Sequence, residues 1–229
     1  AGAQTGSFPF EFNRVGDQLQ FMMVNLRIRA DSTAAMSRAL DRSITKSLFG
    51  STKILSNPDD SGAVLIDPTE MFVQDVGNIG YFLGQQGKTG FRFDKGNSYF
   101  GAIKSFPQNA EVDVHLHYGT NQPSDAITLP SPYSMMLVYH YSLSTLPESD
   151  FRPRIADERV GYFLTQYQDY SSLDRDQAYV RYINRWNLKK KDPTAAISEP
   201  VEPIVFWIEN TTPTEYRPAV KAGIEFWQG

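Results

Sequence analysis

The chain has 229 residues, a length that suits one large domain or one domain with a fragment of another. Its 16 Gly and 14 Pro are ordinary for a globular protein and exclude collagen-like or low-complexity sequence. The formal net charge of −4 argues against nucleic acid as a partner, because phosphate binding needs a basic face. The chain has no cysteine, which excludes disulfides and thiolate metal sites, and no apolar run is long enough to span a membrane.

The N-terminal part predicts a β-hairpin followed by a helix. Apolar and polar residues alternate at 8–12 and again at 19–23, with a turn between them. A helix is expected to begin at Asp31 or Ser32 and to end at Gly50, because apolar residues then recur every three to four positions. We expect this helix to pack against the core through Ala35, Met36, Ala39, Leu40, Ile44 and Leu48.

The middle of the chain predicts short strands separated by Gly, Pro, Asn and Asp. They are expected at 63–67, 90–93, 99–106, 111–118, 134–143 and 160–167. A second, short helix is predicted at 69–75. This spacing favours antiparallel pairing. We therefore predict an α+β fold that is predominantly antiparallel β, as a sandwich or a strongly curved sheet, with one or two packed helices and a C-terminal strand and helix.

The last quarter of the chain differs in composition and in the spacing of its apolar residues. Helical spacing predicts a helix at 177–188, and a connector rich in Pro and Glu at 198–203 leads to an apolar strand at 204–208. A final helix is predicted from Tyr216, Val220, Ile224 and Trp227. The predicted domains are a mainly-β domain at 1–197 and a connector, strand and helix at 198–229. A lone strand and helix cannot bury their apolar faces, so we expect this end to contact another domain or to form a homodimer.

The three histidines are the candidate metal ligands. His115 and His117 lie two residues apart in a predicted strand and therefore project from the same face of the sheet. His140, from another strand, is the candidate third ligand. The alternative interpretation is a polar, solvated strand face, because Glu111 and Asp113 share it.

Charged residues are dense between residues 152 and 163. Arg and Asp alternate there, and such a pattern suits ion pairs that hold an extended segment against its neighbours or against another domain. Two interpretations follow: a structural latch within the domain, or an interdomain contact through Arg154, Asp157, Arg159 and Tyr162.

These residues carry a resemblance to a known family. The motif Arg154-x-x-Asp157-x-Arg159-x-Gly161-Tyr162-Phe163 resembles a signature of the uncharacterised domain that precedes the catalytic domain in large bacterial zinc-dependent, metzincin-like metalloproteases. The segment 185–193, RWNLKKKDP, resembles the same domain. The segment 198–208, SEPVEPIVFWI, is similar to the start of the zincin domain, and the resemblance covers most of the chain.

The resemblance implies a function for the parent protein. Catalysis in that family belongs to a domain with an HExxH helix, in which two His bind zinc and the Glu activates water. This sequence contains no HExxH, so no catalytic residue and no zinc ligand is carried over to it. The resemblance therefore implies an exported protein (periplasmic, outer-membrane-associated or secreted) in which this region scaffolds or covers a C-terminal catalytic domain. Zinc is expected in that catalytic domain.

Two other interpretations stay open. The chain is alternatively a stand-alone β-sandwich binding module for carbohydrate or a protein partner, which its 12 Tyr and 3 Trp would suit. A histidine-based metalloenzyme is the third interpretation, and it requires His115, His117 and His140 to converge.

Overall fold

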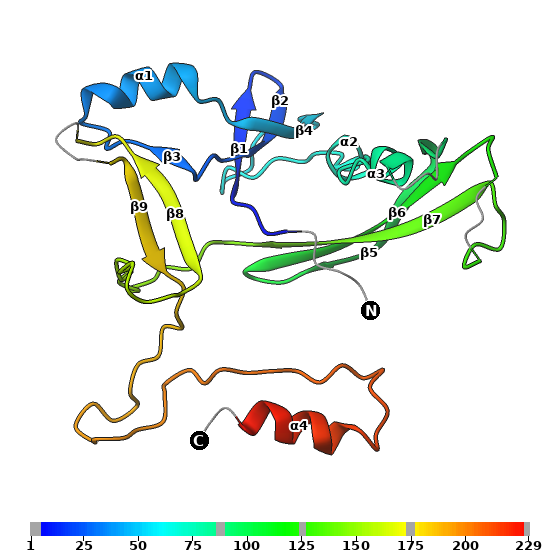
Figure 1. The fold of residues 1–229 in the computed structure, drawn as a ribbon. Helices are drawn as coiled ribbons and strands as arrows, with labels where there is room; N and C mark the ends of the chain where they lie inside the picture. Colours follow the sequence, from blue (N-terminus) through cyan, green and yellow to red (C-terminus); the bar gives the residue numbers. More distant parts are fainter. Residues whose placement is uncertain (1–5, 86–89, 124–126, 173–176, 227–229) are drawn as a thin grey trace. The chain divides into compact units, whose positions relative to one another are not determined.

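The computed structural model describes residues 6–85, 90–123, 127–172 and 177–226 (Figure 1). The chain divides into two compact units. Unit 1 comprises residues 1–149 and 166–180, and unit 2 comprises residues 150–165 and 181–229. The boundary predicted between residues 197 and 198 falls inside unit 2 and stays a prediction. None of the described helices has the length and apolar character needed to cross a membrane.

The predicted fold class is confirmed, since the described part of the chain is mostly antiparallel β with a few short helices. The strands form three small sheets, each of three strands. The first has the order β1-β2-β4, with β1 Phe10–Val15, β2 Gln18–Met23 and β4 Ser47–Lys53. The second has the order β3-β8-β9, with β3 Ile28–Arg29, β8 Leu164–Asp169 and β9 Tyr179–Ile183. The third has the order β5-β6-β7, with β5 Arg92–Ser105, β6 Asn109–Gly119 and β7 Ser134–Ser144.

The predicted hairpin is confirmed as β1 and β2. Its register pairs Phe10 with Met23 and Val15 with Gln18. Gly16 closes the turn with a φ of 62°, a conformation that glycine adopts without steric cost. Phe21 is buried, and its ring stacks on that of Phe12 with 4.8 Å between centroids. Alternation therefore identified both strands, although Phe12 of β1 is exposed.

The prediction of one long helix up to Gly50 is wrong. Helix α1 spans Ala35–Ser43, and the next segment is strand β4, which pairs with β2. Gly50 does not stop a helix. It lies opposite Phe21 in the sheet, and a Cβ there would come within 2.9 Å of the Met71 backbone.

The start and the packing of α1 also differ from the prediction. The residue before the helix is Ala34, whereas Asp31 accepts hydrogen bonds from the backbone and side chain of Thr33 in the preceding turn. No α1 residue whose side chain is described is fully buried, so this helix is not the core helix that its spacing suggested.

Three further elements differ from their predictions. The segment predicted as a helix at 177–188 instead contains β9, whose Tyr, Val and Ile suit a strand. The strand predicted at 63–67 is reduced to a single bridge between Ile66 and Ile54. The strands predicted at 90–93 and 99–106 are one strand, β5, with two register shifts.

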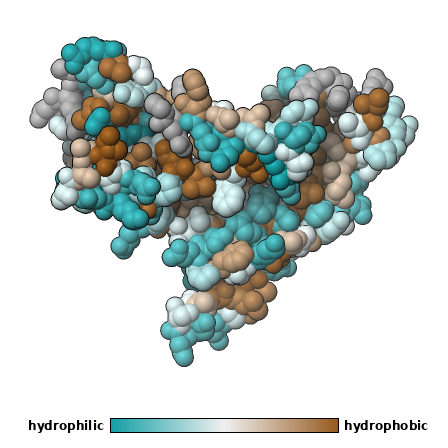
Figure 2. All heavy atoms as spheres, turned by 90° about the horizontal axis from the view of Figure 1, so that it is seen from below, coloured by the Kyte–Doolittle hydropathy of each residue, from teal (hydrophilic) through white to brown (hydrophobic). Residues whose placement is uncertain are grey.

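The helical segments after β4 are short. Helix α2, Thr69–Phe72, ends earlier than predicted, and α3, Ile79–Gln85, was not predicted. Met71 and Phe72 of α2 are buried together with Val73. Elsewhere large hydrophobic residues reach the surface, and Figure 2 shows them in brown among hydrophilic residues.

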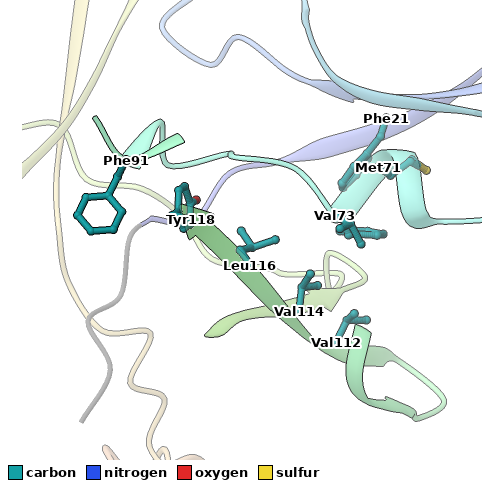
Figure 3. Close-up of a cluster of buried hydrophobic side chains, with 9 residues drawn as sticks. Phe21, Met71, Val73, Phe91, Val112, Val114, Leu116 and Tyr118 are labelled. Carbon is teal, nitrogen blue, oxygen red and sulfur yellow. The ribbon is translucent and has the colours of Figure 1, made fainter. Parts of the chain in front are cut away.

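The core of unit 1 lies between α2 and one face of β6. Val112, Val114, Leu116 and Tyr118 alternate along β6 and are buried, as Figure 3 shows. They cluster with Phe21, Met71, Phe72, Val73 and Phe91. Because successive side chains of a strand point to opposite faces, the odd-numbered residues of β6 face away from this core.

Unit 2 contains little regular structure. The predicted C-terminal helix is confirmed as α4, Arg217–Glu225, although Trp227 lies outside the described residues. No residue of α4 is buried. The predicted strand at 204–208 is not formed, because this segment has no ladder partner among the described residues.

Candidate functional site

The outer face of the β5–β6–β7 sheet gathers the three histidines of the chain. It is formed by the odd-numbered residues of β6, which alternate with the buried ones. The register places Asp113 opposite His140 of β7, and it places His115 opposite Tyr99 of β5. His117 lies opposite Asp94 of β5. The prediction that His115 and His117 share a face is confirmed by this register.

His140 lies between two carboxylates of β6. Its Nδ1 lies 2.7 Å from Asp113 Oδ1, and its Nε2 lies 2.8 Å from Glu111 Oε2. The hydrogen bond to Asp113 and then that to Glu111 raise the pKa of His140 above its ordinary value. Both ring nitrogens can donate together only when the ring is an imidazolium. The geometry therefore favours a protonated His140.

Glu111 is held by three neighbours. Asn109 Nδ2 donates to Glu111 Oε1 over 2.7 Å, and Ser142 Oγ donates to the same atom over 2.9 Å. These two hydrogen bonds, with that from His140, lower the pKa of Glu111. The carboxylate is thus ionised and oriented toward β7.

His117 lies in a separate arrangement at the other end of β6. Its Nδ1 lies 2.9 Å from Asp94 Oδ2, and its Nε2 lies 2.9 Å from Ser134 Oγ. Asn97 also donates to Asp94 Oδ2 over 2.6 Å, and its hydrogen bond is the largest cause of the lowered pKa of Asp94. The imidazole is therefore fixed by one strand on each side of β6.

His115 makes a ring contact. Its imidazole stacks on the Tyr99 ring with 4.8 Å between centroids and 6° between planes. Gly101 leaves room for it, because a Cβ at that position would come within 2.8 Å of His115 Nε2. Sequence reasoning missed Gly101 and Asp94, since only the register between strands brings them to the histidines.

The three histidines do not form a zinc site with this geometry. Each has different partners, and two of them use both ring nitrogens in hydrogen bonds to carboxylate or hydroxyl oxygens. Within the described ranges, no group of three or more His, Asp or Glu side chains is arranged to hold a metal ion. The face is a network of hydrogen-bonded polar side chains.

The predicted interdomain segment lies in unit 2. Arg159 Nε and Nη2 donate to the two carboxylate oxygens of Asp157, over 2.8 and 2.6 Å, and this pair lowers the pKa of Asp157. The pair is exposed and joins residues two apart, so it shapes the segment locally. The segment is attached to β9 through the backbone, where Arg154 O accepts from Ile183 N over 3.0 Å. Tyr162 is exposed.

Unit 2 also carries many exposed hydrophobic side chains. Trp207 is 91 % exposed, and Phe163 of the interdomain segment is 88 % exposed. The others include Ile155, Val160, Ile197, Val201, Val205, Phe206 and Phe226. A hollow of about 370 Å³ in the same unit lies beside Arg185, whose guanidinium sits 4.5 Å from the Phe151 ring centroid. Among the described residues of unit 2, Ile183 is the one hydrophobic residue that is buried.

Comparison with known proteins places the chain in a family of unassigned role. The family model described as Domain of unknown function (DUF5117) matches residues 2–191. The chain belongs to this family. No curated protein and no solved structure matches it.

Proposed function

We propose that this chain is the non-catalytic accessory region of a bacterial zinc-dependent metalloprotease, and that it scaffolds or covers the catalytic domain of the same protein. Two features support the proposal. The motifs at 154–163, 185–193 and 198–208 resemble that family, and unit 2 exposes an apolar surface that a partner would bury. Zinc belongs to the catalytic domain in this proposal, because the three histidines of this chain are not arranged to bind a zinc ion together.

The observation that carries the proposal is that residues 204–208 are apolar but unpaired in the described part of the chain. The sequence IVFWI has the apolar, β-branched and aromatic composition of a buried strand. It nevertheless has no strand partner among the described residues, and Phe206 and Trp207 are exposed. A catalytic domain that pairs with this segment would bury both. We propose that the contact extends to Arg154, Asp157, Arg159 and Tyr162, and that the protein is exported.

The test uses the full-length parent protein. The first measurement is the coding sequence beyond the codon for Gly229, where an in-frame HExxH is expected. The second is zinc-dependent hydrolysis of denatured casein by the wild type and by a Phe206→Ser/Trp207→Ser double variant. We expect the double variant to lose activity several-fold and to be cut faster in limited proteolysis.

The matched control is Ile127→Ser in unit 1. Ile127 is 99 % exposed, so its replacement removes exposed apolar surface outside the proposed contact. This variant is expected to behave as the wild type. A parent protein without HExxH and without zinc-dependent hydrolysis would contradict the proposal. A double variant as active and as resistant as the control would contradict the proposed contact.

One observation favours the second candidate, a carbohydrate or protein binding module. Tyr99 is exposed on a sheet face and stacked on His115, and such a mixture of aromatic and polar groups is typical of binding sites. If the coding sequence holds no HExxH and the chain binds an oligosaccharide that Tyr99→Ala no longer binds, this candidate replaces the first.

A further inference from the structure

Strand β7 has one edge that pairs with no other described strand of unit 1. β7 is an outer strand of its sheet and pairs with β6 over eleven residues, from Ser134↔Gly119 to Ser144↔Asn109, without a register shift. No other described strand pairs with it. An outer strand presents a row of unpaired N–H and C=O groups, and natural proteins usually guard such an edge with charges, proline or a bulge.

The other outer strand of the same sheet is guarded in this way. β5 carries Lys95 and Lys104 and has two register shifts against β6. Strand β1, at the edge of the first sheet, carries Glu11 and Arg14. β7, with the sequence SMMLVYHYSLS, contains no Lys, Arg, Asp, Glu or Pro. The one histidine of β7, His140, has its charge paired with Asp113 and Glu111 of β6 in the same sheet. β7 is therefore the long edge strand of unit 1 that has no Lys, Arg, Asp, Glu or Pro and no register shift.

The sequence of β7 is also complementary to itself. When two copies run antiparallel about a two-fold axis at Tyr139, Leu137 faces Tyr141 and Met135 faces Leu143 on the core side. On the outer face Val138 faces His140, Met136 faces Ser142 and Ser134 faces Ser144. Apolar residues thus meet apolar residues on the inner face, and no like charges are opposed. A two-fold axis also keeps the core faces of the two sheets on one side.

We propose that β7 pairs with β7 of a second copy of this chain, so that the two sheets join into one six-stranded sheet with the order β5-β6-β7-β7-β6-β5. The proposal goes beyond the proposed function and uses a different surface from the contact assigned to unit 2. Val138 is 59 % exposed on the outer face, and in the dimer it lies beside the second strand. Main-chain hydrogen bonds between the edges hold the pair, and the side-chain pattern sets the register.

The experiment measures the association state of the full chain by sedimentation equilibrium. We expect a dimer, and we expect Val138→Lys to weaken dimerisation about tenfold or more, because it places a charge on the edge. The matched control is Ile103→Lys on β5, where a residue of similar size is 58 % exposed at the guarded edge. This control is expected to dimerise as the wild type, and circular dichroism verifies that each variant is folded.

A second measurement fixes the strand and the register. Because the chain has no cysteine of its own, any disulfide between two copies must come from the introduced cysteines. Mixing Met136→Cys with Ser142→Cys is expected to give a disulfide between the two variants, since paired residues lie within disulfide reach. Mixing Ile103→Cys with either variant is expected to give none.

Three outcomes would overturn the proposal. They are a wild-type chain that stays monomeric, a dimer that Val138→Lys does not weaken, and a dimer lost in the Phe206→Ser/Trp207→Ser variant with Val138→Lys unaffected. The last outcome would assign dimerisation to unit 2. All three are independent of whether the parent protein is a protease.

Discussion

The hydroxyl of Tyr118, a residue of the unit 1 core, donates a hydrogen bond of 2.8 Å to Asp75 Oδ1. The same oxygen accepts the N–H of Ile79 over 3.0 Å, at the start of α3. The Tyr118 side chain is fully buried, and burial, followed by the hydrogen bond to Asp75, raises the pKa of its phenol far above the usual value. One buried polar contact therefore connects β6 to the loop that precedes α3.

Removing this hydrogen bond should destabilise unit 1. We expect Tyr118→Phe to lower the free energy of unfolding by about 1.5–3 kcal/mol, because a carboxylate loses a partner. Tyr118→Ala should cost about 3–5 kcal/mol, since it also leaves a cavity. Urea denaturation followed by circular dichroism measures both. Tyr99→Phe, on the exposed face, is the matched control, and a Tyr118→Phe variant as stable as this control would contradict the assigned role.

A side chain at position 101 should disturb the outer face of the same sheet. The Cβ of Gly101→Ala would lie 2.8 Å from His115 Nε2 and 3.1 Å from Asp113 Cβ, so His115 must move away from Tyr99. We expect a loss of about 1–2 kcal/mol in unfolding free energy, as in other overpacked sites.

Two comparisons test that the loss at Gly101 comes from the His115 contact. Gly119→Ala is the control, because its nearest contact would be 3.8 Å from His117. In a His115→Ala background the cost of Gly101→Ala should fall by at least about 0.5 kcal/mol, the smallest coupling expected between touching residues. An unchanged cost in that background would show that the strain arises elsewhere.

The spacing of apolar residues along the chain predicted some strands of this fold correctly and others wrongly. β1, β2, β6 and β7 were predictable because alternation of apolar and polar residues is itself the consequence of one buried face. β4 was not, because Ile44 and Leu48 match the helical spacing of the preceding residues, while pairing with β2 decides the strand. The prediction for the β9 region was wrong for the same reason, since the spacing of Tyr179, Ile183 and Trp186 fits a helix as well as a strand.

The candidate site was predictable only within one strand. His115 and His117 share a face because they are two residues apart in β6. The carboxylates that hold His140 come from β6, and the one that holds His117 comes from β5. Their pairing depends on the register between strands far apart in sequence, which neither spacing nor composition determines.

The stability of unit 1 should depend on pH through His140. Its pKa is raised in the folded state, chiefly by the hydrogen bond to Asp113 and then by that to Glu111. A raised pKa means that the folded state binds the proton more tightly than the unfolded state. The stabilisation is therefore complete below the unfolded value of 6.5 and is lost as pH rises through the folded pKa. Lys104 of β5 lies opposite Glu111 and is a further charged group on this face.

His140→Gln tests this dependence. We expect it to destabilise the chain most near pH 6 and least near pH 9, about two units above the imidazole's ordinary range. Chemical denaturation across that interval measures the difference, and proton NMR of the imidazole gives the pKa directly. A difference between wild type and His140→Gln that stays constant with pH would contradict the arrangement.

The last prediction separates the two roles open to the 154–163 segment. Asp157 accepts both hydrogen bonds of its ion pair from Arg159, two residues away, and the pair is exposed. Such a pair adds little to the stability of a fold. We therefore expect Asp157→Ala to leave the thermal midpoint of the isolated chain unchanged. In the full-length parent protein the same substitution should alter zinc-dependent proteolysis, because the segment is proposed to contact the catalytic domain.

For Asp157→Ala, the thermal midpoint of the isolated chain tests a structural role, and proteolysis by the full-length protein tests the interdomain contact. The hydrogen bonds from Arg159 lower the pKa of Asp157, so the pair stays intact down to pH values below the ordinary carboxyl range, and both assays at neutral pH report on the ionised form. Arg159→Lys, which keeps the charge and loses the bidentate geometry, is the graded control. A lowered midpoint in the isolated chain would make the segment a structural element of unit 2. An unchanged midpoint with unchanged proteolysis would remove this segment from the proposed contact and leave residues 204–208 as its remaining part.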